Sequence, residues 1–463
     1  MKVCINKIKN LLYDITEIVE KHYIIWMICL LIFQVACLVF AYIYYGVNME
    51  VDSPSYIKPA LNLIANGHLD MAPGVPIIKR TPGYIYYLAL VFKLFNNSCE
   101  AAVIGHGIFC VANSFILLKI GELITGKKWP GIIAILCYVL DFTVYYHAMA
   151  IMSDVFFSFL LLSSLYFFVK YYTEKKLRYF VIGTIIMQYS LLTRPQIMYY
   201  CLILAFVLAV MWLFKKVNIK IVLIYLLIWL AVYGGWSLRN YYVNDIFTYT
   251  IANDRDFFNN YAPTVYAWEH GGYTGEKKDE QIEEGKEYLI TLFEEKYGDM
   301  SAVPQDELID KQKDIGVHYL LNHPGPFVGM CCFRLMWEMV IPDVSMLEPM
   351  NLSAPVYYFI LAINFGFLSL SYLIYAIAFL SNIKKLKWID IALFLLASYL
   401  MVSTVSMGYW RFRIDFYMPC LVGMMCALRF VNNTDNTENK KDTNDSDNMS
   451  NTDSMPHSCG QEE

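Results

Sequence analysis

Ten apolar segments divide this chain, and each is expected to cross a bilayer as a helix, which takes about 20 residues, with tilt and ragged ends allowed for. The segment at residues 179–192 is the shortest of them. The chain of 463 residues is 57% hydrophobic and only 17% charged, so it is far more apolar than a soluble domain. The sequence therefore predicts an all-α polytopic membrane protein. The expected spans are residues 23–45, 101–120, 129–148, 155–172, 179–192, 198–214, 219–236, 356–379, 389–405 and 416–431.

The lysines indicate which ends of these spans face the cytoplasm. They precede the first span and then occupy every second connection, which is the pattern of loops retained on the cytoplasmic side. Both termini are therefore expected in the cytoplasm, with the first span kept as an anchor. The lysines concerned are Lys2, Lys7, Lys9, Lys21, Lys127, Lys128, Lys175, Lys176, Lys215, Lys216, Lys220, Lys384, Lys385 and Lys387.

This topology divides the chain into three parts. Residues 1–22 are expected as a cytoplasmic N-terminus and residues 23–431 as a transmembrane domain with two large external loops, 46–100 and 239–355. The remaining tail, residues 432–463, consists largely of Asn, Asp, Ser and Thr. Because it has almost no apolar residues to bury, it is expected to be disordered in the cytoplasm.

Four stretches within the external loops have helical patterns. Two of them, residues 84–95 and 326–342, would reverse the lysine pattern if either one alone crossed the membrane, so both are expected as helices at the outer interface. Residues 276–297 and 301–321 carry apolar side chains at helical spacing among charged ones. The second loop is therefore expected to fold into a mainly helical cap.

Five arginines lie where these spans meet the external loops. Positive charge on this side runs against the usual bias and needs a reason. A guanidinium group is planar, keeps its charge and binds phosphate through parallel hydrogen bonds. We therefore expect a bound phosphate at the outer surface, although a single arginine could simply extend its charge into water. The five are Arg80, Arg194, Arg239, Arg411 and Arg413.

Two acidic residues lie at the same outer edge. Asp52 follows the first span and Asp154 opens the fourth. Carboxylates near lipid are costly and are commonly functional. Both could instead cap helices, since Ser53 and Pro54 are suited to open one over residues 54–66.

The sequence contains no motif for cysteine-based metal binding, nucleotide binding or a hydrolase triad. The twelve cysteines show no CxxC spacing, and there is no P-loop, GxGxxG or Ser-His-Asp pattern. The formal net charge of −5 gives no indication of a nucleic-acid partner.

Taken in order, these residues resemble the GT-C superfamily of membrane glycosyltransferases, most closely the bacterial branch related to protein O-mannosyltransferases and lipid A aminoarabinose transferases. The resemblance covers roughly Tyr23 to Val431. The motifs that carry it are Asp52, Arg80-Thr81-Pro82-Gly83-Tyr84, Asp154, Thr193-Arg194-Pro195, Arg239-Asn240 and Arg411-Phe412-Arg413 with Pro419.

The chain departs from the family pattern at two positions. The late motif usually has proline where Asp415 stands. Asp52 is followed by Ser53 rather than by a second acidic residue. The second departure argues against a protein acceptor.

The resemblance implies a GT-C-like fold and an enzyme of the bacterial plasma membrane. Such enzymes move a sugar from a polyprenyl phosphate, undecaprenyl phosphate in bacteria, to a lipid, glycan or protein acceptor on the external face. Asp52 would act as general base or position the acceptor hydroxyl for inverting attack. Asp154 would orient the partners of Asp52 or share a divalent cation with it, Mg²⁺ or Mn²⁺, if one is used. The carrier phosphate would be held by Lys79, Arg80, Tyr84, Arg194, Arg239, Arg411 and Arg413.

Two other functions fit the same topology. A flippase or transporter of lipid-linked sugars would also carry polar residues at membrane depth, but near mid-span rather than at one edge. A scaffold would bind partner proteins through the second external loop.

Overall fold

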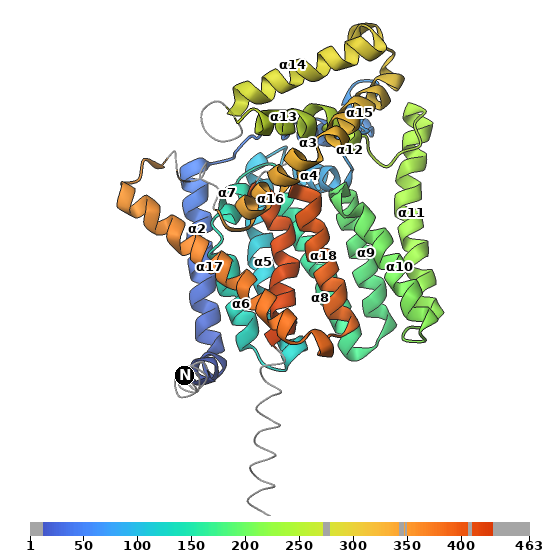
Figure 1. Ribbon diagram of the computed structural model, residues 1–463. Coiled ribbons are helices and arrows are strands. Elements are labelled where there is room, and N and C mark those ends of the chain that lie inside the picture. Colours follow the sequence, from blue (N-terminus) through green and yellow to red (C-terminus); the bar gives the residue numbers. More distant parts are fainter. Residues whose placement is uncertain (1–12, 272–277, 342–346, 348–349, 406–409, 429–463) are drawn as a thin grey trace, which may run out of the picture.

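The structure is a computed structural model. Almost all of the described chain is helical, and the long helices form a bundle with a group of shorter helices covering one end (Figure 1). The predicted helical architecture of a multi-pass membrane protein is thus confirmed. The predicted disordered tail lies outside the described residues, which are 13–271, 278–341, 347, 350–405 and 410–428.

Within the described residues, six helices are long and apolar enough to cross a membrane, and each coincides with a predicted span. The α10 span includes the preceding 3-10 turn η1 (Pro195–Ile197). The six are α2 (Tyr23–Tyr45), α5 (Cys99–Thr125), α8 (Asp154–Glu174), α10 (Met198–Leu213), α11 (Ile219–Asn244) and α17 (Ala354–Ser381).

Three more predicted spans are present as shorter helices. α9 (Leu177–Thr193) packs between α8 and α11, and α18 (Trp388–Val405) follows α17 after the 3-10 turn η6 (Ile383–Lys385). The last predicted span is a helix over residues 413–428, whose side chains are almost all buried.

The expected continuous span at residues 129–148 is interrupted. α6 (Trp129–Val139) ends before Asp141, and α7 (Thr143–Ala148) begins after it. Asp141 Oδ1 accepts a hydrogen bond from the Thr143 backbone N–H (3.3 Å), and the same carboxylate pairs with the buried Arg413. A side chain that bonds nearby backbone in this way competes with the helical hydrogen-bond ladder, which explains the break.

The first loop folds against the bundle. α3 (Pro54–Asn66) has the predicted bounds, and a small antiparallel pair, β1 (Asp70–Ala72) and β2 (Val75–Pro76), follows it. α4 (Gly83–Leu94) is one of the two helices expected at the interface, and it buries Tyr84, Ile85, Leu88 and Phe92 in the core of the bundle.

The second loop forms the group of helices over one end of the bundle. These helices enclose a small core of their own, which includes Phe258, Leu289, Phe293 and Ile315. α14 and α15 lie outermost in this group (Figure 1). Its elements are α12 (Ala252–Asp256), the π-helix η2 (Phe257–Tyr261), α13 (Ala262–Glu269), α14 (Lys278–Tyr297), the 3-10 turn η3 (Met300–Ala302), α15 (Gln305–Asn322) and α16 (Pro324–Val340).

The two ends of the bundle differ in their charges. The lysine pairs lie in the connections α5–α6, α8–α9, α10–α11 and α17–α18, at the end away from the cap. The connections before α8, after α9 and after α18 lie at the capped end, and these carry the predicted site residues.

Candidate active site

A short backbone bridge joins two of the segments that carry site residues. The Asn48 N–H donates to the Met149 carbonyl (2.8 Å), and the Ile151 N–H donates to the Asn48 carbonyl (3.2 Å). Asp52 lies four residues after Asn48, and Asp154 opens α8 three residues after Ile151. The bridge therefore holds the first external loop beside the start of α8.

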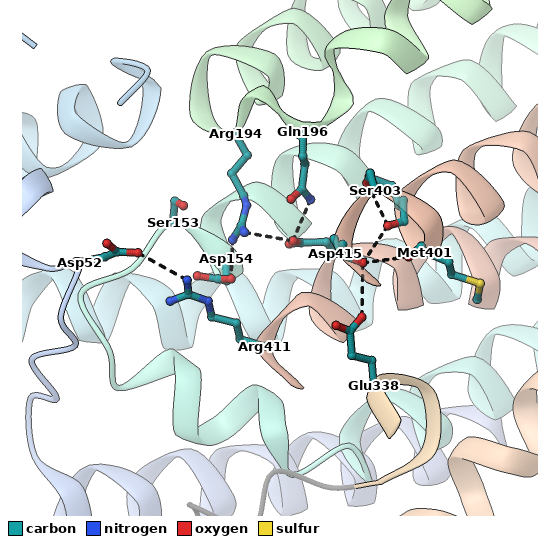
Figure 2. A network of polar contacts seen from close by, with 12 residues as sticks. Asp52, Ser153, Asp154, Arg194, Gln196, Glu338, Met401, Ser403, Arg411 and Asp415 are labelled. Carbon is teal, nitrogen blue, oxygen red and sulfur yellow. Dashed lines mark hydrogen bonds and ion pairs between the residues drawn. The ribbon is translucent and has the colours of Figure 1, made fainter. Parts of the chain in front are cut away.

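Asp52 lies between two guanidinium groups. Its Oδ1 forms an ion pair with Arg80 Nη2. Its Oδ2 lies 3.4 Å from Arg411 Nη2, a contact that Figure 2 shows. Ser55 Oγ accepts a hydrogen bond from Arg80 Nε (3.0 Å), and the Arg80 guanidinium lies 5.0 Å from the centre of the Tyr56 ring. Asp52, Arg80 and Arg411, here called the outer group, keep 29%, 20% and 18% of their side-chain surfaces exposed, so this group is open to solvent.

Arg194 lies between two other carboxylates. Its Nη1 pairs with Asp154 Oδ1, and its Nη2 lies 3.5 Å from Asp415 Oδ2 (Figure 2). Gln196 Nε2 also donates to Asp415 Oδ2 (2.8 Å). Asp154, Arg194 and Asp415, the inner group, are deeper than the outer group, since both carboxylates are fully buried. A buried carboxylate needs such a partner, because an unpaired charge is costly away from water.

The two groups belong to one network of charges. Arg411 interacts electrostatically with Asp154 and Asp415, and Arg80 interacts with Arg194. Three carboxylates thus face three guanidinium groups. The outer group has two guanidinium groups and one carboxylate, so an anion that enters from solvent is favoured there.

The carboxylates do not provide a set of metal ligands. In the part of the chain that the structure describes, no three His, Cys, Asp or Glu residues gather closely enough to hold a metal ion. Both oxygens of Asp52 face arginine, and Asp154 Oδ2 and Asp415 Oδ1 are buried with no hydrogen-bond partner among the described residues. The Mg²⁺ or Mn²⁺ considered for Asp52 and Asp154 therefore lacks a fitting site, and we assign no step to one.

The surroundings affect the ionisation of two groups near the opening. Burial disfavours the charged form of Arg80, but Tyr56 and Asp52 favour it, and the Arg80 pKa lies above its ordinary value. Asp256, at the end of α12, is only 7% exposed. Burial raises the Asp256 pKa, although a hydrogen bond from Asn260 and the nearby Arg80 act in the opposite direction.

Arg413 lies outside this network. It is fully buried, and its Nε and Nη2 pair with Asp141 at 3.1 and 2.9 Å. Its Nη1 donates to the carbonyls of Glu338 (3.1 Å) and Ile341 (2.8 Å), and its Nη2 also bonds Thr143 Oγ1. These bonds tie α16 and the α6–α7 break to the helix at residues 413–428, so the structure gives Arg413 a structural role rather than access to a phosphate.

Arg239 is also engaged elsewhere. Its Nη1 donates to the carbonyl of Ile77 (2.6 Å), and its Nη2 lies 3.4 Å from the carbonyl of Leu69. Arg239 therefore holds the segment around β1 and β2 against the end of α11.

Tyr84 and Lys79 flank the outer group without joining it. Tyr84 is fully buried, with its hydroxyl 3.0 Å from His106 Nε2. Lys79 is exposed, and its backbone carbonyl accepts a hydrogen bond from Thr250 Oγ1 (2.8 Å), which joins the first loop to the second.

The sequence did not identify two residues at the inner group, Asp415 and its hydrogen-bond partner Gln196. Asp415 was noted only as a departure from the family pattern, and Gln196 gave no signal. An acidic residue that directly precedes an apolar run is costly there, and this signal could have identified Asp415. The helix-cap interpretation of Asp52 and Asp154 finds no support, since no capping side-chain hydrogen bond is found at the start of α3 or α8.

Comparison with known proteins bears on the same region. The family profile described as dolichyl-phosphate-mannose-protein mannosyltransferase matches residues 79–236, which include Arg80, Asp154 and Arg194. No curated protein matches the chain.

Two crystal structures of ArnT from Cupriavidus metallidurans align with the chain. The one bound to undecaprenyl phosphate has 13% identity and a TM-score of 0.39, with 86% of this chain and 77% of that chain covered. The apo structure has 12% identity and a TM-score of 0.37, with 86% and 76% covered. Likeness at this level supports no conclusion about what this chain binds.

The family match confirms the predicted resemblance to the GT-C superfamily. The chain is thus a multi-pass membrane protein whose residues 79–236 are similar to this mannosyltransferase family.

Proposed function

We propose that this protein transfers a sugar from a polyprenyl-phosphate carrier to an acceptor at the external face of the bacterial plasma membrane, with inversion at the anomeric carbon. The observation that carries the proposal is the position of Asp52 between Arg80 and Arg411. Two guanidinium groups that face one oxyanion from two sides suit a phosphate equally well. The site lies at the end of the bundle opposite the lysine pairs, which supports an external location.

In the proposed reaction, the carrier phosphate takes the place of the Asp52 carboxylate. Arg80 and Arg411 then face two of its oxygens. As the bond from the phosphate oxygen to the anomeric carbon breaks, its electron pair stays on the phosphate, and the two guanidinium groups stabilise the added negative charge. The carrier ester supplies the leaving group, so no nucleotide is needed.

Asp52 becomes available when the phosphate binds. Released from both arginines, its carboxylate accepts the proton of the acceptor hydroxyl, whose oxygen attacks the anomeric carbon from the face opposite the phosphate. Asp154 and Asp415 hold Arg194 in the buried inner group. The two carboxylates of this group also attract Arg411 and so help to position it.

The arrangement favours a transferase over a flippase or transporter. A transporter of this kind is expected to have its ionisable groups near the middle of its spans. Here Asp154 is the first residue of α8, and Arg194 directly follows α9.

Asp52→Asn tests this function directly. In isolated membranes supplied with a polyprenyl-phosphate sugar and acceptor, loss of a general base should lower the rate of sugar transfer by about 100- to 10,000-fold. Asp245→Asn is the matched control, because Asp245 is an exposed residue that directly follows α11 and belongs to neither the outer nor the inner group. Transfer by Asp52→Asn at the wild-type rate would contradict the proposed role of Asp52.

A further inference from the structure

The cap brings a carboxylate near the outer group that the proposed reaction does not use. Asp256 is the last residue of α12, and its side chain is buried. It interacts electrostatically with Lys79, Arg80 and Asp52. Because α12 belongs to the cap (Figure 1), Asp256 adds a charge of the cap to the surroundings of the outer group.

A single hydroxyl group ties α12 to the segment that carries Arg80. Thr250 Oγ1 donates a hydrogen bond to the Lys79 carbonyl (2.8 Å) and accepts one from the N–H of Ala252 (3.1 Å). Ala252 is the first residue of α12. The residue before Arg80 is therefore joined to the helix that ends at Asp256.

α15 supports α12 from within the cap. Lys313 of α15 forms an ion pair with Asp254 of α12 (2.7 Å). Gly316 of α15 packs directly against η2, where an added Cβ would lie 2.7 Å from the Phe257 carbonyl oxygen and 2.8 Å from the Phe258 nitrogen. Such π-helical turns are rare and frequently occur at functional sites. The end of α12 is therefore held in place by its neighbours.

The Asp256 carboxylate has one oxygen available to a ligand. Its Oδ1 accepts a hydrogen bond from Asn260 Nδ2 (2.7 Å), and no other hydrogen bond or ion pair to this carboxylate is found among the described residues. Burial raises the pKa of this carboxylate, whereas the bond from Asn260 and the charges of Lys79 and Arg80 favour its ionised form. A buried carboxylate with an unpaired oxygen is uncommon, because it loses hydration without gaining a hydrogen bond. Oδ2 is thus suited to accept a hydrogen bond from a bound molecule.

The donor of the proposed reaction supplies a fitting partner for this oxygen. Its phosphate would lie between Arg80 and Arg411, and its lipid chain belongs in the bilayer, so its sugar extends toward the cap. Sugar hydroxyl groups donate hydrogen bonds, and an ionised carboxylate is a strong acceptor for them. We propose that Asp256 accepts a hydrogen bond from a hydroxyl group of the transferred sugar and so contributes to the selection of the donor. This inference rests on the proposed function and adds to it a specificity-determining residue from the cap.

Asp256→Asn changes the proposed contact and little else. The amide oxygen of asparagine can still accept the bond from Asn260, while its NH2 group takes the place of Oδ2 and cannot accept a hydrogen bond. Asp254→Asn is the matched control, because it removes the same charge from the same helix at a residue that pairs with Lys313 instead.

The test compares undecaprenyl phosphate with undecaprenyl phosphate esterified to a hexose. Mannose, glucose and galactose are each tried as the hexose, and the ester that the wild-type protein binds most tightly is used for the variants. For each purified protein in detergent, the ratio of the two dissociation constants measures what the sugar contributes to affinity.

In Asp256→Asn, the contribution of the sugar should fall about tenfold, since a hydrogen bond to a charged group is lost. Undecaprenyl phosphate itself should bind this variant at least as tightly as wild type, because one negative charge near Arg80 is removed. This second measurement also shows that the variant is folded. Asp254→Asn should give the wild-type ratio.

Two results overturn the inference and leave the proposed function intact. An unchanged ratio in Asp256→Asn shows that no sugar hydroxyl depends on this residue, and a raised KM for the acceptor would then assign Asp256 to the acceptor site. Weaker binding of both ligands by the same factor shows that Asp256 supports the phosphate site instead. Failure of the wild-type protein to bind either ligand contradicts the proposed function as well.

Discussion

At the scale of single residues, the outer group has a consequence for ligand affinity. Because the Asp52 carboxylate occupies the place proposed for the phosphate, it competes with the ligand for Arg80 and Arg411. Asp52→Asn should therefore bind undecaprenyl phosphate roughly three- to tenfold more tightly while transferring sugar far more slowly. Arg80→Ala should bind it more weakly than wild type. Titration of purified protein in detergent measures both, and weaker binding by Asp52→Asn would contradict the competition.

Arg411 and Arg413 should respond differently to the same substitution. Arg413→Ala leaves the fully buried Asp141 without its ion pair, which should lower stability by about 3–5 kcal/mol. Arg411→Ala should leave stability nearly unchanged and weaken binding of the phosphate, since the Arg411 side chain is partly exposed. Thermal unfolding in detergent and ligand titration distinguish the two variants. An Arg413→Ala protein with wild-type stability and weakened phosphate binding would show that Arg413 contributes to phosphate binding rather than to stability.

These two arginines also show what the sequence can and cannot predict about single side chains. The residue types and their position at an outer helix end were enough to select Arg80, Arg194 and Arg411, which the structure brings together around Asp52 and Asp154. Arg411 and Arg413 are alike by the same criteria. Their different roles depend on the turn between α18 and the next helix and on Asp141, 272 residues away from Arg413. Such distant pairing cannot be deduced from local patterns.

At the scale of elements, the contact between α4 and α9 positions both groups of the site. Gly83, the first residue of α4, packs against the end of α9, where a Cβ would lie 2.8 Å from the Leu192 carbonyl oxygen and 2.6 Å from Thr193 Oγ1. Gly83→Ala should therefore push the two helices apart and destabilise the protein by about 1–3 kcal/mol. Because Arg80 and Arg194 lie beside this contact, sugar transfer should also fall. Gly366→Ala, in open space on α17, is the control, and an unchanged melting temperature for Gly83→Ala would show that α4 and α9 do not depend on this contact.

The elements were predicted well where hydrophobic periodicity alone determines them. α3 matches its expected range of residues 54–66, and α2 matches residues 23–45. The break between α6 and α7 was not predicted, because one aspartate within an apolar run does not by itself indicate that a helix ends. Its significance depends on the ion pair between Asp141 and Arg413, which the sequence does not show. The parallel bridge at Asn48 and Ala150 was also beyond prediction, since it joins two irregular segments by backbone bonds that depend little on residue type.

At the scale of the whole molecule, the proposed reaction depends on the orientation that the lysines predict. The proposed reaction requires that Asp52 and its neighbours face the outside, because the transfer is proposed to take place at the external face. Val51 is 97% exposed and adjoins Asp52, whereas Lys216 is exposed in the connection between α10 and α11. These two positions therefore report on opposite ends of the bundle.

Cysteine labelling in intact cells decides between the two orientations. The parent chain for this test lacks Cys29 and Cys332, the exposed cysteines among the described residues, and also Cys4 and Cys459, which lie outside them. In this parent chain, the variant Val51→Cys should react with a membrane-impermeant maleimide in intact cells. Lys216→Cys should react only after the membrane has been permeabilised, and the parent chain without either new cysteine reports the background. The physical reason is the retention of lysine-rich connections in the cytoplasm, which places the capped end outside. Labelling of Lys216→Cys but not of Val51→Cys in intact cells would put the charged site in the cytoplasm, and sugar transfer at the external face would then have to be abandoned.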